Sequence, residues 1–234
     1  MPHTHTGEQA VRWRVFPDEV SLQRNALERV VASAREAITG HGAFDIVLAG
    51  GNTPRKLYRA LRRAEADWPR WHIWFGDERC APADDPERNS RMARDEWLEH
   101  VAIPAANVHA IPAERGSREA AALYARELRS VDAFDLVLLG LGEDGHTASL
   151  FPGHDWGTHA DSPEVIAVSD APKPPPERVS LSAHRLSHAH AVLFLVEGAG
   201  KRDAIAAWKR GDAIPAAAIA PDAGVDVLLD AAAA

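Results

Sequence analysis

Stretches of consecutive apolar residues alternate with polar segments along the chain, and the two longest of these stretches predict buried strands. Residues 44–49 and 134–141 are almost entirely apolar, as expected for strands that are covered on both faces. Between positions 27 and 38 the apolar residues recur at the three- and four-residue spacing of a helix, which Gly40 and Gly42 end. The first part of the chain therefore predicts a helix followed by a strand.

Shorter apolar stretches continue this alternation to the end of the chain. They predict strands over residues 13–16, 72–75, 165–168, 191–196 and 225–229, and helices from Met92 onward, over 117–130 and over 201–209. Residues 81–91 and the four prolines within 171–177 indicate loops. Strands that alternate with helices predict an α/β fold with a mainly parallel sheet and helices on both faces, in which ligands bind at the carboxyl ends of strands.

The composition is that of a soluble folded protein, and we expect a single domain over residues 1–234. The chain is 46% hydrophobic and 26% charged, and its length is enough to bury an ordinary core. No apolar run is long enough to span a bilayer, and the N-terminus lacks the pattern of a secretory signal. A lone Cys80 excludes an internal disulfide, so we expect a cytoplasmic protein.

The formal net charge of −8 argues against nucleic-acid binding, which requires a basic surface. An anionic ligand needs a local cluster of basic residues instead. Arg79 follows a predicted strand, Lys173 and Arg178 flank the proline segment, and Lys201 follows a glycine turn. Each alone could be an ordinary surface charge. Because they share a placement near turns, and because arginine pairs well with phosphate, they predict one common anion site.

The first glycine turn, residues 50–54 (GGNTP), joins a predicted buried strand to a helix. Thr53 suits the helix cap and Pro54 the first helical position. Backbone N–H groups at a helix start favour a bound phosphate. A tight turn with a good cap would have the same sequence, so this segment alone leaves both interpretations open.

The second glycine turn, residues 140–145 (GLGEDG), matches the dinucleotide-binding pattern G-x-G-x-x-G but lacks its context. Pro152 and Gly153 limit any following helix to about two turns. Glu164 precedes the next predicted strand, whereas the pattern requires an acidic residue at the end of that strand. We therefore expect no nicotinamide cofactor.

His146 follows the second turn directly, near the predicted start of a short helix. Histidine titrates close to neutral pH and can take a proton from water. Asp144 could support the imidazolium that forms, or it could cap the next helix. Because a lone histidine is more often structural, the neighbouring residues decide its role.

Two other groups of residues indicate no separate chemistry. Thr147 and Ser149 lack the flanking glycines of a nucleophile elbow, so we expect them to pack or to cap. The histidines at positions 184, 188 and 190 lack a carboxylate or cysteine signature, so we predict no metal site.

Five segments occur in an order that is typical of one known family, and together they span most of the chain. These segments are residues 48–54 (LAGGNTP), 76–79 (GDER), 140–153 (GLGEDGHTASLFPG), 172–182 (PKPPPERVSLS) and 198–202 (GAGKR). No single segment is specific, but the set resembles the 6-phosphogluconolactonases within the glucosamine-6-phosphate isomerase/6-phosphogluconolactonase family.

The resemblance implies a three-layer, Rossmann-like α/β/α sandwich. It implies hydrolysis of 6-phospho-D-glucono-1,5-lactone to 6-phosphogluconate in the pentose phosphate pathway, without a cofactor. The implied general base for water is His146, supported by Asp144. The residues implied in binding the phosphate or its surroundings are Gly51, Asn52, Thr53, Arg79, Arg178 and Lys201, with Lys173 as a less certain addition. The resemblance identifies no oxyanion stabiliser, and it implies a monomer.

Two alternatives remain beside this interpretation. In glucosamine-6-phosphate deaminases a glutamate closely follows the histidine, whereas residues 149–153 (SLFPG) contain no acid, and an aromatic residue usually stands at the position of Arg79. A noncatalytic sugar-phosphate sensor would need a DNA-binding module, but only some 12 residues precede the first predicted strand and the net charge is negative. Both comparisons favour the lactonase.

Overall fold

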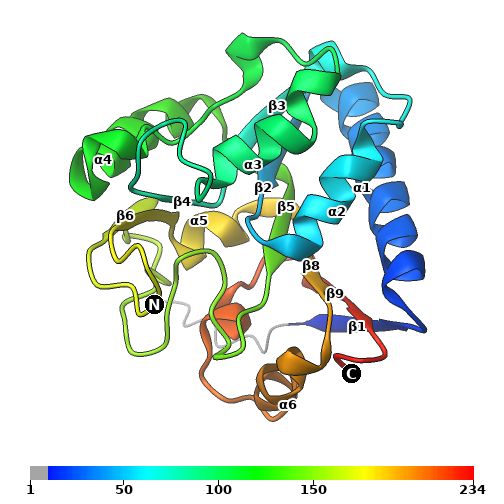
Figure 1. Cartoon of the computed structure of the whole chain (residues 1–234), viewed down its shortest axis with the longest axis vertical. Coiled ribbons are helices and arrows are strands. Elements are labelled where there is room, and N and C mark those ends of the chain that lie inside the picture. Colours follow the sequence, from blue (N-terminus) through cyan, green and yellow to red (C-terminus); the bar gives the residue numbers. More distant parts are fainter. Residues whose placement is uncertain (1–9) are drawn as a thin grey trace, which may run out of the picture.

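A sheet of parallel strands organises residues 10–234, which the computed structural model describes (Figure 1). The strand order is β1-β9-β8-β5-β2-β3, and every neighbouring pair is parallel. The strands are β1 (Val11–Phe16), β2 (Phe44–Leu48), β3 (Trp71–Phe75), β5 (Phe134–Gly140), β8 (Ala189–Val196) and β9 (Val225–Asp230). All six coincide with strands predicted from the apolar stretches.

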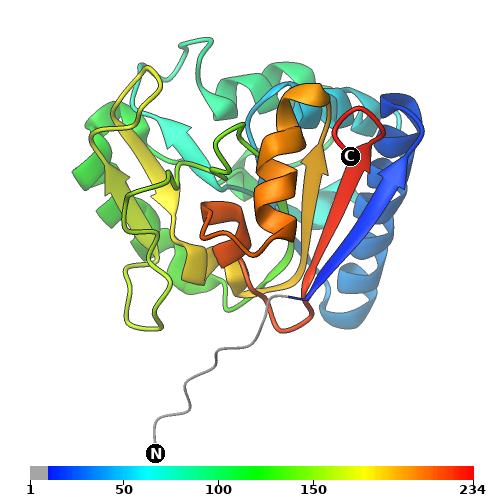
Figure 2. The same cartoon turned by 90° about the horizontal axis from the view of Figure 1, so that it is seen from below.

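Helices cover both faces of this sheet, which confirms the predicted α/β architecture. Figure 2 shows α6 on one face of β8 and β9 and α1 on the opposite face. The helices are α1 (Glu19–His41), α2 (Asn52–Leu61), α3 (Asn89–Glu96), α4 (Ser117–Glu127), α5 (Ala183–Ser187) and α6 (Arg202–Lys209). Helix α1 begins where the Asp18 side chain accepts a hydrogen bond from the Ser21 N–H at 2.8 Å, and it ends at Gly42.

A second, antiparallel sheet was not expected from the sequence. It has the order β4-β7-β6 and consists of β4 (Asp77–Arg79), β7 (Arg178–Leu181) and β6 (Val165–Val168). Only β6 was predicted as a strand, because β4 and β7 are short and begin with charged residues. Helix α4 packs on this sheet. The predicted short helix after His146 is wrong, since residues 143–153 contain only turns and an isolated bridge.

One apolar core extends through both sheets. It contains strand residues such as Val47 and Phe194 of the main sheet together with Val179 and Leu181 of the small sheet, all at most 1% exposed. Burial of this kind supplies most of the free energy that stabilises a fold. Among the described residues, no helix has the length and apolar character needed to cross a membrane.

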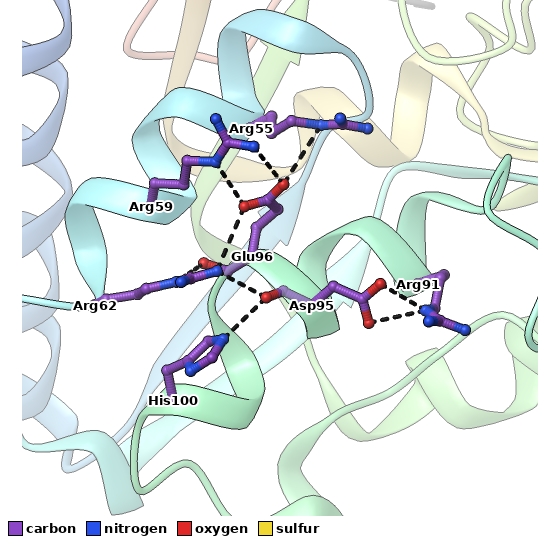
Figure 3. A network of polar contacts seen from close by, with 7 residues as sticks. All are labelled: Arg55, Arg59, Arg62, Arg91, Asp95, Glu96 and His100. Atoms are coloured by element: carbon purple, nitrogen blue, oxygen red, sulfur yellow. Dashed lines mark hydrogen bonds and ion pairs between the residues drawn. The ribbon is translucent and has the colours of Figure 1, made fainter.

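An arginine-rich ion-pair network fastens α2 to α3 on the solvent side (Figure 3). Glu96 of α3 accepts hydrogen bonds from the Nε and Nη2 atoms of Arg59 at 2.6 and 2.8 Å. Arg62 and Arg55 lie at 3.4 and 3.9 Å from the same carboxylate. The bidentate bond with Arg59 lowers the pKa of Glu96 despite the opposing effect of burial. Three guanidinium groups, two from α2 and one from Arg62 directly after it, therefore converge on one carboxylate of α3.

We predict that Glu96→Gln lowers the free energy of unfolding by about 1 kcal/mol at pH 7, because it leaves three arginines without their shared anion. Since the folded pKa of Glu96 is lowered, its contribution is present above the ordinary glutamate pKa of about 4.3 and is lost as the pH falls further. Urea denaturation at neutral and acidic pH measures this. Glu119→Gln, which removes a single exposed pair with Arg115, is the matched control and should cost much less. Equal losses in the two variants would contradict the role of the network.

Candidate active site

A cleft of about 280 Å³ opens at the carboxyl ends of β2, β3 and β5. Parallel strands bring their carboxyl ends to one edge, so the turns that follow β2, β3 and β5 meet there. The lining includes both predicted glycine turns and the catalytic candidate His146, together with four basic residues: Arg79, Lys173, Arg178 and Lys201. The structure thus brings together residues that are far apart in the sequence.

The first glycine turn leaves the start of α2 open to a ligand. Gly51 is the N-cap residue, with a φ of 101° that favours glycine, and no side chain caps the helix. The predicted cap by Thr53 is therefore wrong, and Pro54 is the third helical residue. Backbone N–H groups in a first turn have no partner within the helix, so an uncapped helix start can donate to an anion. Gly51 lines the cleft, whereas Asn52 and Thr53 stand beside the lining.

The second glycine turn holds the imidazole of His146 against Asp144. The Nδ1 atom of His146 and a carboxylate oxygen of Asp144 form a short hydrogen bond, and the backbone N–H of His146 donates to the same oxygen at 3.2 Å. Burial raises the pKa of Asp144, but the bond with His146 outweighs it, so the net shift is downward. An ionised carboxylate can only accept, so Nδ1 carries the proton and Nε2 remains free to take one.

The absence of a side chain at Gly142 makes room for this pair. A Cβ atom at this position would lie 1.9 Å from Nδ1 of His146 and 2.6 Å from a carboxylate oxygen of Asp144. The imidazole also packs against the Phe151 ring, with 5.0 Å between ring centroids. The histidine is therefore confined by both a bare backbone and an aromatic ring.

Arg178 is partly committed to holding the proline segment. Its Nε atom donates to the Pro175 carbonyl at 3.1 Å, and its Nη2 atom donates to the carbonyls of Lys173 and Pro174 at 3.1 and 3.2 Å. Burial lowers the pKa of its guanidinium group, although the attraction of Asp77 opposes this effect. Nη1 is the one nitrogen of Arg178 with no hydrogen bond to a described residue, so it is the one available to a ligand.

Lys201 and Arg79 complete the basic lining from two other elements. Lys201 ends a short 3-10 segment, Ala199–Lys201, before α6, and burial lowers the pKa of its ammonium group against the attraction of Glu143. Arg79 stands on β4 and donates from Nη1 to the carbonyl of Glu87. Four cations around one cleft in a chain of net charge −8 favour an anionic ligand.

Sequence reasoning missed a buried polar network in the cleft wall. Asp77 is 6% exposed and lines the cleft beside Asn89, yet only Arg79 of the 76–79 turn was singled out. Glu78 is fully buried and accepts hydrogen bonds from the backbone N–H groups of Asn89 and Ser90 at 2.7 and 2.9 Å, which caps α3. The feature of the sequence that could have indicated this network is the acidic pair Asp77 and Glu78, which follows the predicted strand 72–75 after Gly76.

No group of three or more His, Cys, Asp or Glu side chains within residues 10–234 is arranged to hold a metal ion. Of the three histidines considered in the sequence, His188 lies 3.6 Å from Asp132, outside the cleft.

Comparisons with known proteins agree with this architecture. The family described as glucosamine-6-phosphate isomerases/6-phosphogluconolactonase matches residues 17–228. A 6-phosphogluconolactonase of a Nostoc species is 37% identical over 236 residues, covering 94% of this chain and 95% of that protein. One of a Synechocystis species is 40% identical over 79% of both chains. The crystal structure of a Thermotoga maritima 6-phosphogluconolactonase superposes with a TM-score of 0.87 at 27% identity, covering 94% of this chain and all of that one.

We predict that Gly142→Ala displaces the His146 imidazole, because the new methyl group would occupy the position of its ring. The hydrogen-bonded Nδ1 proton should then lose its strongly downfield resonance in NMR spectra. Gly40→Ala is the control, since a Cβ at Gly40 meets nothing within 4 Å. An unchanged Nδ1 resonance in a folded Gly142→Ala protein would show that the ring does not depend on this space.

Proposed function

Because the chain belongs to the glucosamine-6-phosphate isomerase/6-phosphogluconolactonase family, we propose that its cleft binds 6-phospho-D-glucono-1,5-lactone and hydrolyses it to 6-phospho-D-gluconate. The observation that carries this proposal is one cleft that is lined by an Asp-oriented histidine, four basic side chains and an open helix start. The histidine supplies a base for water, and the cations supply an anchor for the phosphate.

The reaction requires one water molecule and no covalent intermediate. Nε2 of His146 accepts a proton from water while the oxygen adds to the C1 carbonyl of the lactone. The tetrahedral intermediate then expels the ring oxygen, which takes the proton from Nε2 of His146 and so restores the neutral imidazole. The carboxylic acid formed at C1 releases its proton to solvent and becomes a carboxylate. Asp144 stabilises the imidazolium formed in the first step through its bond to Nδ1. General-base assistance of this kind contributes about 10²- to 10⁴-fold in rate.

The phosphate-binding role falls to residues around the first glycine turn and the basic lining. Gly51, Asn52 and Thr53 offer backbone N–H groups at the start of α2. Arg79, the free nitrogen of Arg178 and Lys201 offer charge-assisted hydrogen bonds. A phosphate held in this way fixes the distance from the sugar ring to His146, which lowers the entropic cost of reaching the transition state.

The deaminase alternative is disfavoured by the surroundings of His146. The side chain that packs on its imidazole is Phe151, which is 1% exposed and has no acid–base function. In the deaminases a glutamate closely follows the histidine, and no acidic residue occurs between His146 and Gly153 of this chain. We also propose that the chain forms a single domain, that it is a monomer and that it is located in the cytoplasm.

We predict that His146→Ala reduces enzymatic hydrolysis by about 10²- to 10⁴-fold, because no other group takes the proton from water. Acid release from freshly generated lactone measures the rate, with an enzyme-free reaction to correct for spontaneous opening. His190→Ala removes an exposed histidine of β8 and should retain the native rate. Full activity in a folded His146→Ala protein would refute the assignment of the base. A native protein no faster than the enzyme-free reaction would refute the function itself.

A second prediction concerns the binding of the phosphate by Lys201. Lys201→Gln should raise KM for the phosphorylated lactone by about 10- to 100-fold, because it removes a charge-assisted hydrogen bond. The same variant should leave the slower hydrolysis of unphosphorylated glucono-1,5-lactone nearly unchanged. Lys209→Gln, whose ammonium lies over the Trp13 ring away from the cleft, is the matched control. An equal effect of Lys201→Gln on both substrates would mean that Lys201 does not bind the phosphate.

A further inference from the structure

The carboxylate of Asp77 is buried in the cleft wall and has no part in the proposed base or phosphate anchor. It stands at the start of β4, opposite Ser180 of β7, and is 6% exposed while lining the cleft. Burying an ionised carboxylate is costly unless its oxygens receive enough hydrogen bonds. The cost of burying the Asp77 carboxylate must therefore be offset by hydrogen bonds that its oxygens accept.

The described residues give this carboxylate only two hydrogen bonds, both from neutral donors. Its Oδ1 atom accepts from Nδ2 of Asn89 at 2.9 Å, and its Oδ2 atom accepts from Oγ of Ser149 at 2.6 Å. No Lys, Arg or His within residues 10–234 lies within ion-pair distance of it, and its attraction to Arg178 is electrostatic without a hydrogen bond. Because each carboxylate oxygen can accept at least two hydrogen bonds and Asp77 lines the cleft, acceptor capacity remains for a ligand.

Both donors are themselves held rigidly. Asn89 is the first residue of α3, and its backbone N–H donates to Glu78. Its side-chain amide packs closely against Gly50, where an added Cβ atom would lie 2.1 Å from Oδ1 of Asn89. The backbone N–H of Ser149 donates to Oγ of Ser180 at 3.2 Å. Asn89 also donates to the Asp77 carbonyl at 3.0 Å. The direction of the carboxylate is thus set by the start of α3, which packs against the first glycine turn, and by the segment that follows His146.

We propose that Ser149 and Asn89 are positioning residues that aim the Asp77 carboxylate at a hydroxyl group of the sugar ring, which makes Asp77 a determinant of substrate specificity. This proposal rests on the proposed function, since it takes the phosphosugar lactone as the ligand. A carboxylate repels a phosphate but accepts strongly from a neutral hydroxyl. Asp77 therefore selects the polyhydroxylated ring, while the basic residues select the phosphate.

The test combines variants with substrates that each lack one ring hydroxyl. Asp77→Asn keeps the size of the side chain and removes its charge, and Ser149→Ala removes one positioning bond. The kcat/KM of each protein is measured on 6-phosphogluconolactone and on its 2-, 3- and 4-deoxy analogues, with thermal unfolding as the check on folding. Ser130→Ala, which removes a surface hydroxyl bonded to the Glu127 carbonyl, is the control.

We expect Asp77→Asn to lower kcat/KM on the parent lactone by about 10- to 100-fold, the usual effect of losing a hydrogen bond to a charged group. On one of the three analogues the loss should shrink to within about threefold, because the hydroxyl that Asp77 accepts from is already missing. Ser149→Ala should show a smaller loss that disappears on the same analogue. The substrate dependence separates this role from a merely structural one, which would lower all four rates together.

Equal losses on all four substrates in folded Asp77→Asn protein would overturn the proposal, as would an unchanged rate on the parent lactone. If Asp77→Asn does not fold, the kcat/KM values of Ser149→Ala on the four substrates provide the test. Equal losses on all four substrates, or no loss on any of them, would then overturn the proposal. Failure of the proposed function has a different signature. In that case the native protein does not accelerate opening of the parent lactone at all.

Discussion

Parallel pairing of β2, β3 and β5 is the constraint from which the cleft follows. Adjacent parallel strands must end at the same edge, so the three turns that leave them are brought together whatever their separation in the sequence. One turn presents the open start of α2, the next presents Asp77 and Arg79, and the third presents His146. The small antiparallel sheet then adds Arg178 from a distant part of the chain.

Buried charges fix the walls of this cleft where apolar packing cannot. Glu78 is completely buried, caps α3 and lies 3.3 Å from the Nε atom of Arg88, which is itself buried. Such pairs are expensive to desolvate, and their hydrogen bonds are directional. The start of α3, and with it Asn89, is thereby held in one place relative to the turn after β3. The result is a site whose geometry is set before a ligand arrives.

The apolar pattern predicted the main sheet well, since strands such as 44–48 and 134–140 are buried on both faces and must be apolar. It failed for β4 and β7, whose residues Glu78 and Arg178 are charged and yet buried. Their partners come from other elements, and a local pattern carries no information about them. His146 and the basic residues could be named from the sequence because each stands beside a local glycine turn, proline segment or strand end. The bonds from Asn89 and Ser149 to Asp77 join different elements, so the sequence pattern could not predict them.

The attachment of Arg178 to the proline segment has a consequence for how this position can vary. A guanidinium group is planar and donates in several fixed directions at once, so it can hold the carbonyls of residues 173–175 while keeping one nitrogen turned elsewhere. A lysine would carry the same charge on a single nitrogen and could not reach along both directions. Position 178 is therefore constrained by shape more than by charge, and exchange between the two basic residues, commonly treated as conservative, is not conservative here.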